Sequence, residues 1–467
     1  MAERTNEDIM DLIIRARGGR SSTAAGADPI FDQMRGVDWP IKCTVGPGLE
    51  GAIACKSKVG FVNGSTGTLI YRGYDIFDLC AHSTFEEASY LLLYGNLPDE
   101  RELEAFKIRM REYRFLPNTL RMMMSAPVEN MNPMAALRIG TNFMHQRLTW
   151  RYKDDARPSG EDAIASDEDS IPMETVPTGE RHAIYEFQRR HLNRPPDARP
   201  GTDDAESMDS CIRLISGMAT LAAAVGRLRR GRLPIEPDPD LSHAANLLYM
   251  MTGRRPTSLE ERVMDVALIL HADHGMNAST FACMVVASTM SDIYFSVDAG
   301  IGALNGPLHG GANEQVARLL REIGSPEEVP DWYIKAREAG RKVPGFGHRV
   351  YKTYDPRARV LAPLAWTMAE SNPDCARMLA IAKRLEGMVV ADLGENKKIF
   401  PNVDLYSGIV YQAMGVPEDM YTVIFAVSRV AGWTARVMEY LENNRIFRPR
   451  ALYVGEFDRE YLPMENR

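Results

Sequence analysis

The feature that most constrains the fold is a pair of long helical segments that are apolar on nearly every face. From Met420 through Val437 apolar side chains occupy almost all sides of a predicted helix, with Arg429 in its middle. The segment from Ser258 to Leu270 also leaves almost no polar face after its first turn. Helices of this kind must be surrounded by other elements, since a surface helix keeps one side polar. We expect both segments in the core of a large helical domain.

Helical periodicity recurs along most of the chain. Overlapping capping boxes at Ser83 to Glu87 and a box formed by Ser258 and Glu261 predict helix starts. Ala312 to Ile323 carries apolar residues at helical spacing. Alternating strand patterns are few and short, as at Thr68 to Tyr71. The sequence therefore predicts an all-α protein.

Two regions differ in composition from this helical pattern. Residues 1–45 are polar and rich in Gly, Ser and Pro, and we treat them as an N-terminal extension of uncertain order. Residues 150–209 are enriched in Asp, Glu, Pro, Gly and Ser, with one helix-like patch from Glu180 to Leu192. We interpret the second region as an insertion that is not part of the core.

Charge, cysteine use and hydropathy exclude several classes of protein. A net charge of −8 without a basic stripe argues against a nucleic-acid surface. Six scattered cysteines without C-x-x-C spacing favour neither a disulfide framework nor a zinc site. The N-terminus is acidic and lacks the apolar core of a signal peptide, and stretches such as Val263 to Leu270 are shorter than the ~20 residues that span a bilayer. We expect a soluble, cytoplasmic protein.

Four of the nine histidines, His271, His274, His309 and His348, fall within a short stretch of the chain. His271 and His274 form an H-x-x-H pair, which is typical either of core or capping histidines or of half a metal site. Zinc needs three or four ligands, and no Cys-rich partner motif is present. We therefore expect no metal.

His309 lies in a glycine-rich turn, Asn305 to Asn313, just ahead of the helix predicted from Ala312. The partial positive charge of a helix N-terminus opposes protonation, so His309 should stay neutral and able to donate a hydrogen bond to a developing oxyanion. A histidine that only caps its helix is the alternative.

The segment Pro344 to Arg357 places His348 and several cations behind a glycine loop. Gly345 and Gly347 would let backbone N–H groups approach a ligand, although the loop matches neither a Walker A motif nor a dinucleotide fingerprint. Arg357 could bind a carboxylate in bidentate fashion, and Lys352 could meet a phosphate. The pattern indicates an anion site, with a solvated basic loop as the alternative.

Asp404 and Arg429 each allow two interpretations. Asp404 precedes an apolar helical run, so it is either an N-cap or a general base. A base at a helix N-terminus would need desolvation to offset the helix dipole, which lowers a carboxyl pKa. Arg429 in its apolar helix must face either an internal carboxylate or a bound anion, because an unpartnered buried arginine is costly.

Together these segments resemble the citrate synthase family. HADHGMNAS (271–279), GPLHGGANE (306–314), PGFGHRVYKTYDPRA (344–358), NVDLYSG (402–408) and VSR (427–429) occur in the family's order and spacing. The resemblance extends over about residues 46–147 and 210–467. It implies two helical domains with the active site between them: a large domain from 46–310 and 420–467, and a small domain from 311–419.

The resemblance also implies roles for individual residues. Asp404 would remove a methyl proton from acetyl-CoA, His309 would hydrogen-bond the enolate oxygen, and His348 would protonate the oxaloacetate carbonyl. The resemblance also gives two sets of binding residues. For oxaloacetate or citrate they are His274, Arg357, Arg429 and, from the second subunit, Arg448; for CoA they are Val343, Pro344, Gly345, Phe346, Gly347 and Lys352. A homodimer or higher even-numbered oligomer follows, and acetyl-CoA is a substrate, so no cofactor is expected.

Two other functions fit the same motifs. A 2-methylcitrate synthase would use the same catalytic residues on propionyl-CoA, although Ser407-Gly408 after the Asp404 motif looks more like citrate synthases. A catalytically silent helical protein that binds acyl-CoA is the second alternative, and the presence of Asp404, His309 and His348 together speaks against it. One departure from the family is Asn132, where relatives commonly have histidine before Pro-Met.

Overall fold

The computed structural model describes residues 6–18, 41, 43–145, 204–370, 372–456, 459–461 and 463–466. Most of the predicted insertion, including the helix-like patch from Glu180 to Leu192, lies outside the described residues. The insertion was predicted to end at 209, but its last residues already belong to a helix that begins at Asp204.

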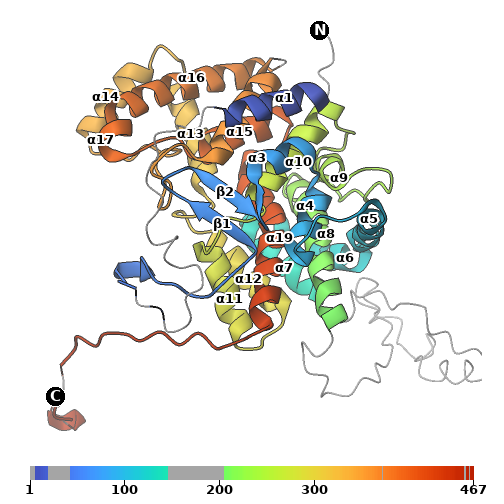
Figure 1. The fold of residues 1–467 in the computed structure, drawn as a ribbon, viewed down its shortest axis with the longest axis vertical. Helices are drawn as coiled ribbons and strands as arrows, with labels where there is room; N and C mark the ends of the chain where they lie inside the picture. The colour runs from blue at the N-terminus through green and yellow to red at the C-terminus, as the bar shows by residue number, and fades with distance from the viewer. Residues whose placement is uncertain are drawn as a thin grey trace, which may run out of the picture.

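The described chain is built of helices, which confirms the all-α class (Figure 1). The α-helices have these bounds: α1 Asn6–Arg17, α3 Ile76–His82, α4 Phe85–Tyr94, α5 Glu100–Arg114, α6 Pro117–Met124, α7 Pro133–His145, α8 Asp204–Leu228, α9 His243–Thr252, α10 Ser258–His271, α11 Ala278–Ser288, α12 Ile293–Leu304, α13 Ala312–Ile323, α14 Val329–Glu338, α15 Pro356–Ala369, α16 Pro373–Val389, α17 Glu395–Lys397, α18 Asp404–Ala413 and α19 Tyr421–Leu441. The short helices are η1 Pro47–Leu49, η2 Val128–Asn130, η7 Val390–Gly394, η8 Glu418–Met420 and η9 Met464–Asn466.

Capping side chains begin the helices where the sequence predicted them, with one shift. Thr84 accepts the backbone N–H of Glu87 at 3.3 Å and begins α4. For α10 the capping box is formed by Thr257 and Glu260, one residue earlier than the predicted pair. The predicted pair was wrong because Glu261 instead accepts a hydrogen bond from another helix's cap, Ser242, at 2.6 Å.

A small antiparallel sheet supports the loop after α10. Its strands, in the order β1-β2-β3, are β1 Gly60–Asn63, β2 Thr68–Tyr71 and β3 Tyr74–Asp75. Gly60 pairs with Tyr71 and Asn63 with Thr68. The Tyr71 hydroxyl donates to the backbone carbonyl of Asp273 at 2.9 Å, so the sheet fixes a segment that carries one of the site histidines.

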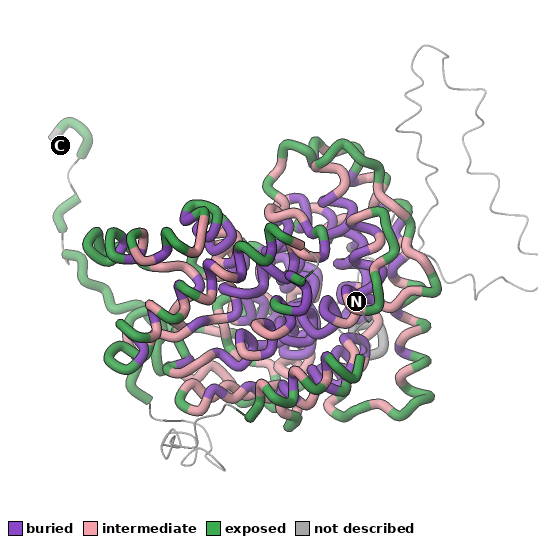
Figure 2. Tube along the Cα trace, turned by 90° about the horizontal axis from the view of Figure 1, so that it is seen from above, coloured by how far each residue is buried: buried purple, intermediate pink, exposed green. Residues whose placement is uncertain are grey.

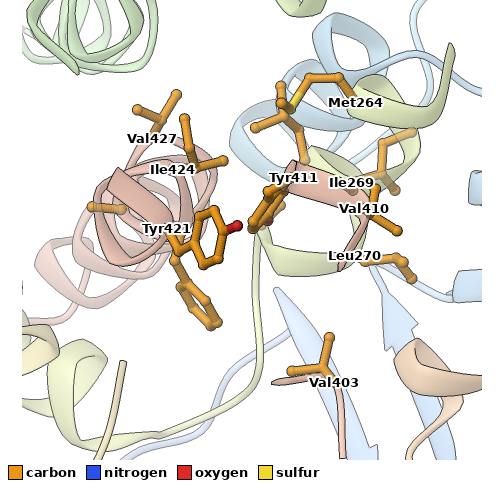
Figure 3. Packing of buried hydrophobic residues seen from close by; sticks show 14 of the residues in the cluster. Met264, Ile269, Leu270, Val403, Val410, Tyr411, Tyr421, Ile424 and Val427 are labelled. Carbon is orange, nitrogen blue, oxygen red and sulfur yellow. The ribbon is translucent and has the colours of Figure 1, made fainter. Parts of the chain in front are cut away.

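Helices α10, α18 and α19 meet in the core. Met264, Leu270, Val410 and Ile424 are fully or almost fully buried there (Figure 3). Every residue of α19 from Tyr421 to Val437 is buried, as its lack of a polar face predicted. The buried residues run through the middle of the helical body, and the C-terminal segment is exposed (Figure 2).

Helix α8 contains an apolar stretch longer than the apolar runs that we singled out in the sequence. Met208–Leu228 is long and apolar enough to cross a membrane by composition alone. Most of this stretch is buried against other helices, which is the environment of a core helix in a globular protein.

Helices α13 to α18 pack mainly on one another, and they lie together on one side of the molecule (Figure 1). They meet the rest of the chain through α1, α3, α10, α19 and η8. The predicted domain boundaries at 311 and 419 remain a prediction.

The N-terminal region contains an element that composition did not reveal. Residues 6–17 form α1, which packs against α3 and α15. Ile9 and Ile13 are fully buried in this contact. Arg17 pairs with Asp78 of α3 at 2.6 Å, and Arg359 of α15 donates to the carbonyl of Ala16 at 2.5 Å. The description of residues 1–45 as an extension of uncertain order was therefore wrong for this helix.

Candidate active site

Four predicted site residues from separate parts of the chain are influenced by the charge of Arg357. His274 follows α10, His309 precedes α13, His348 lies in the loop before α15, and Asp404 begins α18. Burial is the largest influence on the pKa of each of these four groups, and the positive charge of Arg357 acts on all four. The fold therefore brings them within electrostatic reach of one guanidinium.

His348 is held as a neutral imidazole with a defined tautomer. Its Nδ1 accepts the backbone N–H of Val350 at 2.9 Å and that of Tyr351 at 3.1 Å. Burial lowers the pKa of His348 to about 4, against the opposing effect of Asp355. Backbone N–H groups can only donate, so Nδ1 carries the lone pair and the ring hydrogen lies on Nε2. The side chain can offer Nε2–H to an acceptor at neutral pH.

His309 has the opposite tautomer. Its Nε2 accepts the backbone N–H of Ser279 at 3.3 Å and lies 2.8 Å from the Ser279 hydroxyl oxygen. The ring hydrogen is therefore on Nδ1. Burial lowers the pKa of His309 to about 4, and Arg429 and Arg357 add to the effect. His309 is neutral, as predicted, but the main cause is burial and not the helix N-terminus. Burial of this side chain could not be inferred from the sequence.

Asp404 is the first residue of α18 and does not cap it. Val403 occupies the N-cap position, and the side chain of Asn402 accepts the backbone N–H of Asp404 at 3.0 Å. The interpretation of Asp404 as an N-cap was therefore wrong. The Asp404 carboxylate makes no hydrogen bond to any residue that the structure describes. Burial raises its pKa to about 7, although Arg357 acts in the opposite direction. This is the desolvation that a base at this position requires.

Arg357 is paired with a carboxylate of its own chain. Its Nε lies 3.0 Å from Asp355 Oδ1 and its Nη2 lies 2.7 Å from Oδ2, with both side chains buried. The bidentate geometry predicted for a ligand carboxylate is thus used on Asp355, two residues earlier on the N-cap of α15. The described residues provide no hydrogen bond to the Nη1 group of this guanidinium.

Arg429 is buried without a carboxylate partner. Its Nε donates to the carbonyl of His271 at 2.5 Å, and its guanidinium carbon lies 4.7 Å from the centre of the Phe425 ring. The Nη2 group is buried with no hydrogen-bond partner in the described chain. Burial lowers the pKa of Arg429 to about 10, and Arg357 adds to this shift. The structural ion pair was therefore the wrong interpretation, and the unpartnered Nη2 favours a bound anion.

An ion pair that the sequence analysis missed holds the His271 to His274 segment. Arg436 contacts Asp273 through Nε and Nη2, each at 2.7 Å from a carboxylate oxygen, and both residues are buried. Arg436 lies seven residues after Arg429, which places both on one face of α19. That spacing was a signal in the sequence, since two arginines on one face of an apolar helix both need anionic partners.

His274 and His271 have different surroundings. His274 Nε2 lies 3.2 Å from the Tyr351 hydroxyl, and its ring centre is 5.1 Å from that of His348. Burial and then Arg357 lower the pKa of His274 well below its usual range, so it serves as a neutral donor or acceptor. His271 packs edge-on against Phe425 in the core. No three His, Cys, Asp or Glu side chains gather as a metal site in the described part of the chain.

The glycine loop is tied to the strand-like segment before α18. Gly345 and Gly347 have φ angles of +86° and +81°, which favour glycine. The N–H of Gly347 donates to the Phe400 carbonyl at 2.8 Å, and Asn402 N–H donates to the Gly345 carbonyl at 3.0 Å. The N–H of Gly347 is therefore occupied, contrary to our expectation that it would approach a ligand. Lys352 is exposed. The other residues predicted to contact CoA, Val343, Pro344 and Phe346, are partly exposed.

Arg448 is the predicted site residue that the structure leaves apart from the others. It is exposed and lies after α19, in a segment that extends away from the helical body (Figure 1). Its side chain bonds only the neighbouring carbonyl of Pro449, at 3.3 Å, among the described residues. Its role in a second subunit remains a prediction.

The fold and the site define a class of protein before any comparison. A helical body surrounds a carboxyl group with a pKa of about 7, two neutral histidines with opposite tautomers and a buried arginine whose Nη2 has no hydrogen-bond partner among the described residues. These groups are the kind that an enzyme uses for proton transfer and for the binding of an anionic substrate.

Comparison with known proteins gives the family. The model described as citrate synthase, C-terminal domain, matches residues 48–450. The citrate synthase of Haloferax volcanii is 38% identical over 422 residues, which are 90% of this chain and 98% of the relative. That of Acidithiobacillus ferridurans is 39% identical, with the same coverage. The chain belongs to the citrate synthase family.

Solved structures agree with this assignment. The crystal structure of citrate synthase from Pyrobaculum aerophilum is 39% identical, has a TM-score of 0.73, and covers 92% of this chain and 98% of its own. Citrate synthase from Thermoplasma acidophilum, in a ternary complex with carboxymethyl coenzyme A and oxaloacetate, is 32% identical with a TM-score of 0.75. The match covers 91% of this chain and all of that one. Helix α1 lies before the first residue that the family model matches.

Proposed function

We propose that this protein condenses acetyl-CoA with oxaloacetate and water to give citrate and CoA. The observation that carries the proposal is Asp404, a carboxyl group whose pKa is raised by burial to about 7 and which no described side chain binds. Such a group can accept a proton from a weak carbon acid at neutral pH. Membership in the citrate synthase family supports the same reaction.

The first step forms the nucleophile. Asp404 takes a proton from the methyl carbon of acetyl-CoA, and the C–H electron pair becomes the enolate π bond. His309 offers its Nδ1–H to the thioester oxygen, where negative charge develops. The imidazole is neutral at pH 7 and its Nε2 accepts from Ser279, so Nδ1–H is the donor that remains for this oxygen.

The second step forms the carbon–carbon bond. The enolate carbon attacks the ketone carbon of oxaloacetate, and the Nε2–H of His348 supplies a proton to the ketone oxygen. Arg429, whose Nη2 has no partner among the described residues, binds one carboxylate of oxaloacetate, and Arg357 binds the second through Nη1, the nitrogen that Asp355 does not occupy. Water then hydrolyses the citryl-CoA thioester and releases citrate and free CoA. The hydrolysis restores both groups, since His348 regains a proton from water and Asp404 releases the methyl proton to solvent.

We also propose a homodimeric, cytoplasmic enzyme that needs neither a metal nor another cofactor. The six free cysteines are in keeping with a reducing compartment. Residues Val343 to Gly347, with Lys352, are proposed to contact CoA. The exposed segment that carries Arg448 favours a contribution to another subunit's site.

The test is product analysis with purified protein. Acetyl-CoA and oxaloacetate together should give citrate and free CoA in equal amounts, whereas neither substrate alone should release CoA. EDTA should leave the rate unchanged. Propionyl-CoA should react more slowly, and a faster reaction with it would assign the protein to 2-methylcitrate synthesis instead. CoA release without oxaloacetate would contradict the proposed condensation.

A further inference from the structure

Trp433 contacts the candidate active site through the hydroxyl group of Ser279. It lies on α19, one turn after Arg429, and its side chain is fully buried. Its indole N–H donates to the hydroxyl oxygen of Ser279 at 3.2 Å. The same oxygen lies 2.8 Å from Nε2 of His309. We propose that Trp433 is a positioning residue, which fixes the Ser279 hydroxyl so that this hydroxyl can hold His309 in its Nδ1–H tautomer. The inference rests on the proposed role of His309.

The hydrogen bonds of Ser279 explain why a fixed donor is needed. The hydroxyl has one hydrogen and two nearby acceptors, Asn277 Oδ1 at 2.7 Å and His309 Nε2 at 2.8 Å. Asn277 Oδ1 already accepts the backbone N–H of Thr280 at 3.1 Å. Nε2 also accepts the backbone N–H of Ser279, so a hydrogen on Nε2 would face that donor. The single hydroxyl hydrogen can be donated either to Asn277 Oδ1 or to His309 Nε2, and only donation to His309 gives Nε2 a second donor that keeps Nδ1–H for the substrate.

A serine side chain has three staggered rotamers, and only some of them place Oγ beside His309. The Trp433 N–H supplies a donor that satisfies a lone pair of Oγ in this position. Without that donor, the rotamers that place Oγ away from His309 become more populated. In those rotamers Nε2 loses one of its two hydrogen-bond donors. The imidazole then has a weaker preference for the Nδ1–H tautomer.

The packing around Trp433 keeps the donor in place. A Cβ atom at Gly300 of α12 would lie 3.1 Å from two carbons of the Trp433 ring and 2.3 Å from the Cys283 sulfur. Glycine at 300 thus allows α12, α11 and α19 to meet closely around the indole. His309 itself lies on the connection between α12 and α13, outside any helix. The closely packed ring of Trp433 can therefore restrain His309, which lies outside any helix, through the Ser279 hydroxyl.

The test is a double-mutant cycle with Trp433→Phe and Ser279→Ala, measured as kcat for citrate formation. Trp433→Phe should lower kcat about threefold to tenfold, the effect of one neutral hydrogen bond, and should leave the KM for oxaloacetate unchanged. In the Ser279→Ala background the same change should have no further effect, because Trp433 acts through the hydroxyl. Losses that multiply in the double variant would show that Trp433 acts through packing and would overturn the proposal.

Because phenylalanine is smaller than tryptophan, a second variant separates the hydrogen bond from the cavity. Benzothienylalanine at position 433 keeps the two-ring shape and replaces the N–H with sulfur. It should give the same loss of kcat, and a full wild-type kcat would overturn the proposal. Trp332 on α14 is the matched control, since its N–H bonds Glu322 at 2.9 Å on the surface, and Trp332→Phe should leave kcat unchanged.

A spectroscopic measurement separates this inference from the proposed function. If the wild-type protein forms no citrate, the proposed function fails, but the ¹⁵N shifts of the His309 ring can still be measured. The wild-type ring should show the Nδ1–H tautomer, and the benzothienylalanine variant should show a mixture. Identical shifts in the two proteins would overturn the role of Trp433.

Discussion

Arg429 and Arg436 are both buried on α19, but only Arg436 has a carboxylate partner in the described chain. Arg436 is bound by Asp273, so the folded protein satisfies its charge. Arg429 has an unpartnered Nη2 and a pKa that burial lowers to about 10. A buried cation that lacks a partner in the free protein is costly, and an anionic ligand can supply that partner. The two residues therefore offer a matched pair for separating binding from stability.

We predict opposite effects for the two substitutions to methionine. Arg429→Met should raise the KM for oxaloacetate at least ~10-fold, as expected for the loss of a charge-assisted hydrogen bond, and should not lower the melting temperature. Arg436→Met leaves Asp273 buried and unpaired, and should cost about 3–5 kcal/mol of stability. Thermal unfolding and steady-state kinetics measure both. A destabilised Arg429→Met protein with wild-type KM would assign Arg429 to the fold.

The raised pKa of Asp404 predicts the acid limb of the pH profile. A general base must be deprotonated, so kcat/KM should fall about tenfold per pH unit below a pH of about 7. His309 and His348, with pKa values of about 4, stay neutral throughout this range and should add no second limb. A rate that stays constant from pH 8 to pH 5.5 would show that Asp404 has an ordinary pKa or is not the base.

At the scale of elements, α1 connects parts of the chain that are far apart in sequence. It packs on α3 and α15, and it belongs to a region that composition alone marked as an extension. Its packing is asymmetric, since Ile13 is fully buried while the neighbouring Ile14 is 45% exposed. The amphipathic pattern of such a short helix is visible in sequence, but the surface that it covers is not.

We predict that Ile13→Ala lowers the free energy of unfolding by about 2–4 kcal/mol, because it leaves a cavity beneath α1. Ile14→Ala, next to it on the exposed side, should change stability by less than ~0.5 kcal/mol. Denaturant unfolding of both variants measures the difference. Equal effects would mean that α1 does not dock as described.

Local patterns predicted the elements well, and long-range contacts account for what they missed. The bounds of α13 and the burial of α19 follow from periodicity and were confirmed. The sequence could not show that Arg357 is bound by Asp355. An arginine that pairs with a carboxylate of its own chain cannot be distinguished in sequence from one that binds a ligand carboxylate. It also could not show that burial sets the pKa of Asp404, since desolvation depends on neighbours from distant segments. The motifs located the site, and tertiary packing determined its protonation states.

At the scale of the whole molecule, the segment after α19 extends from the body with Arg448 exposed (Figure 1). We predict that Arg448 acts in the site of a partner subunit. In a mixed dimer of Asp404→Asn and Arg448→Ala chains, one site would carry both defects and the other neither. One site in two should therefore form citrate, although each homodimer is nearly inactive. A verified mixed dimer without activity would place Arg448 in the site of its own chain.

The central claim is that a desolvated Asp404 starts the condensation by removing a proton from acetyl-CoA. The most direct measurement compares oxaloacetate-dependent CoA release by the wild-type protein and by Asp404→Asn, with folding and oxaloacetate binding checked in both. The wild-type protein should release CoA only when both substrates are present. Asp404→Asn should be at least ~10²-fold slower while it binds oxaloacetate normally. A folded Asp404→Asn protein that releases CoA at the wild-type rate would contradict the claim.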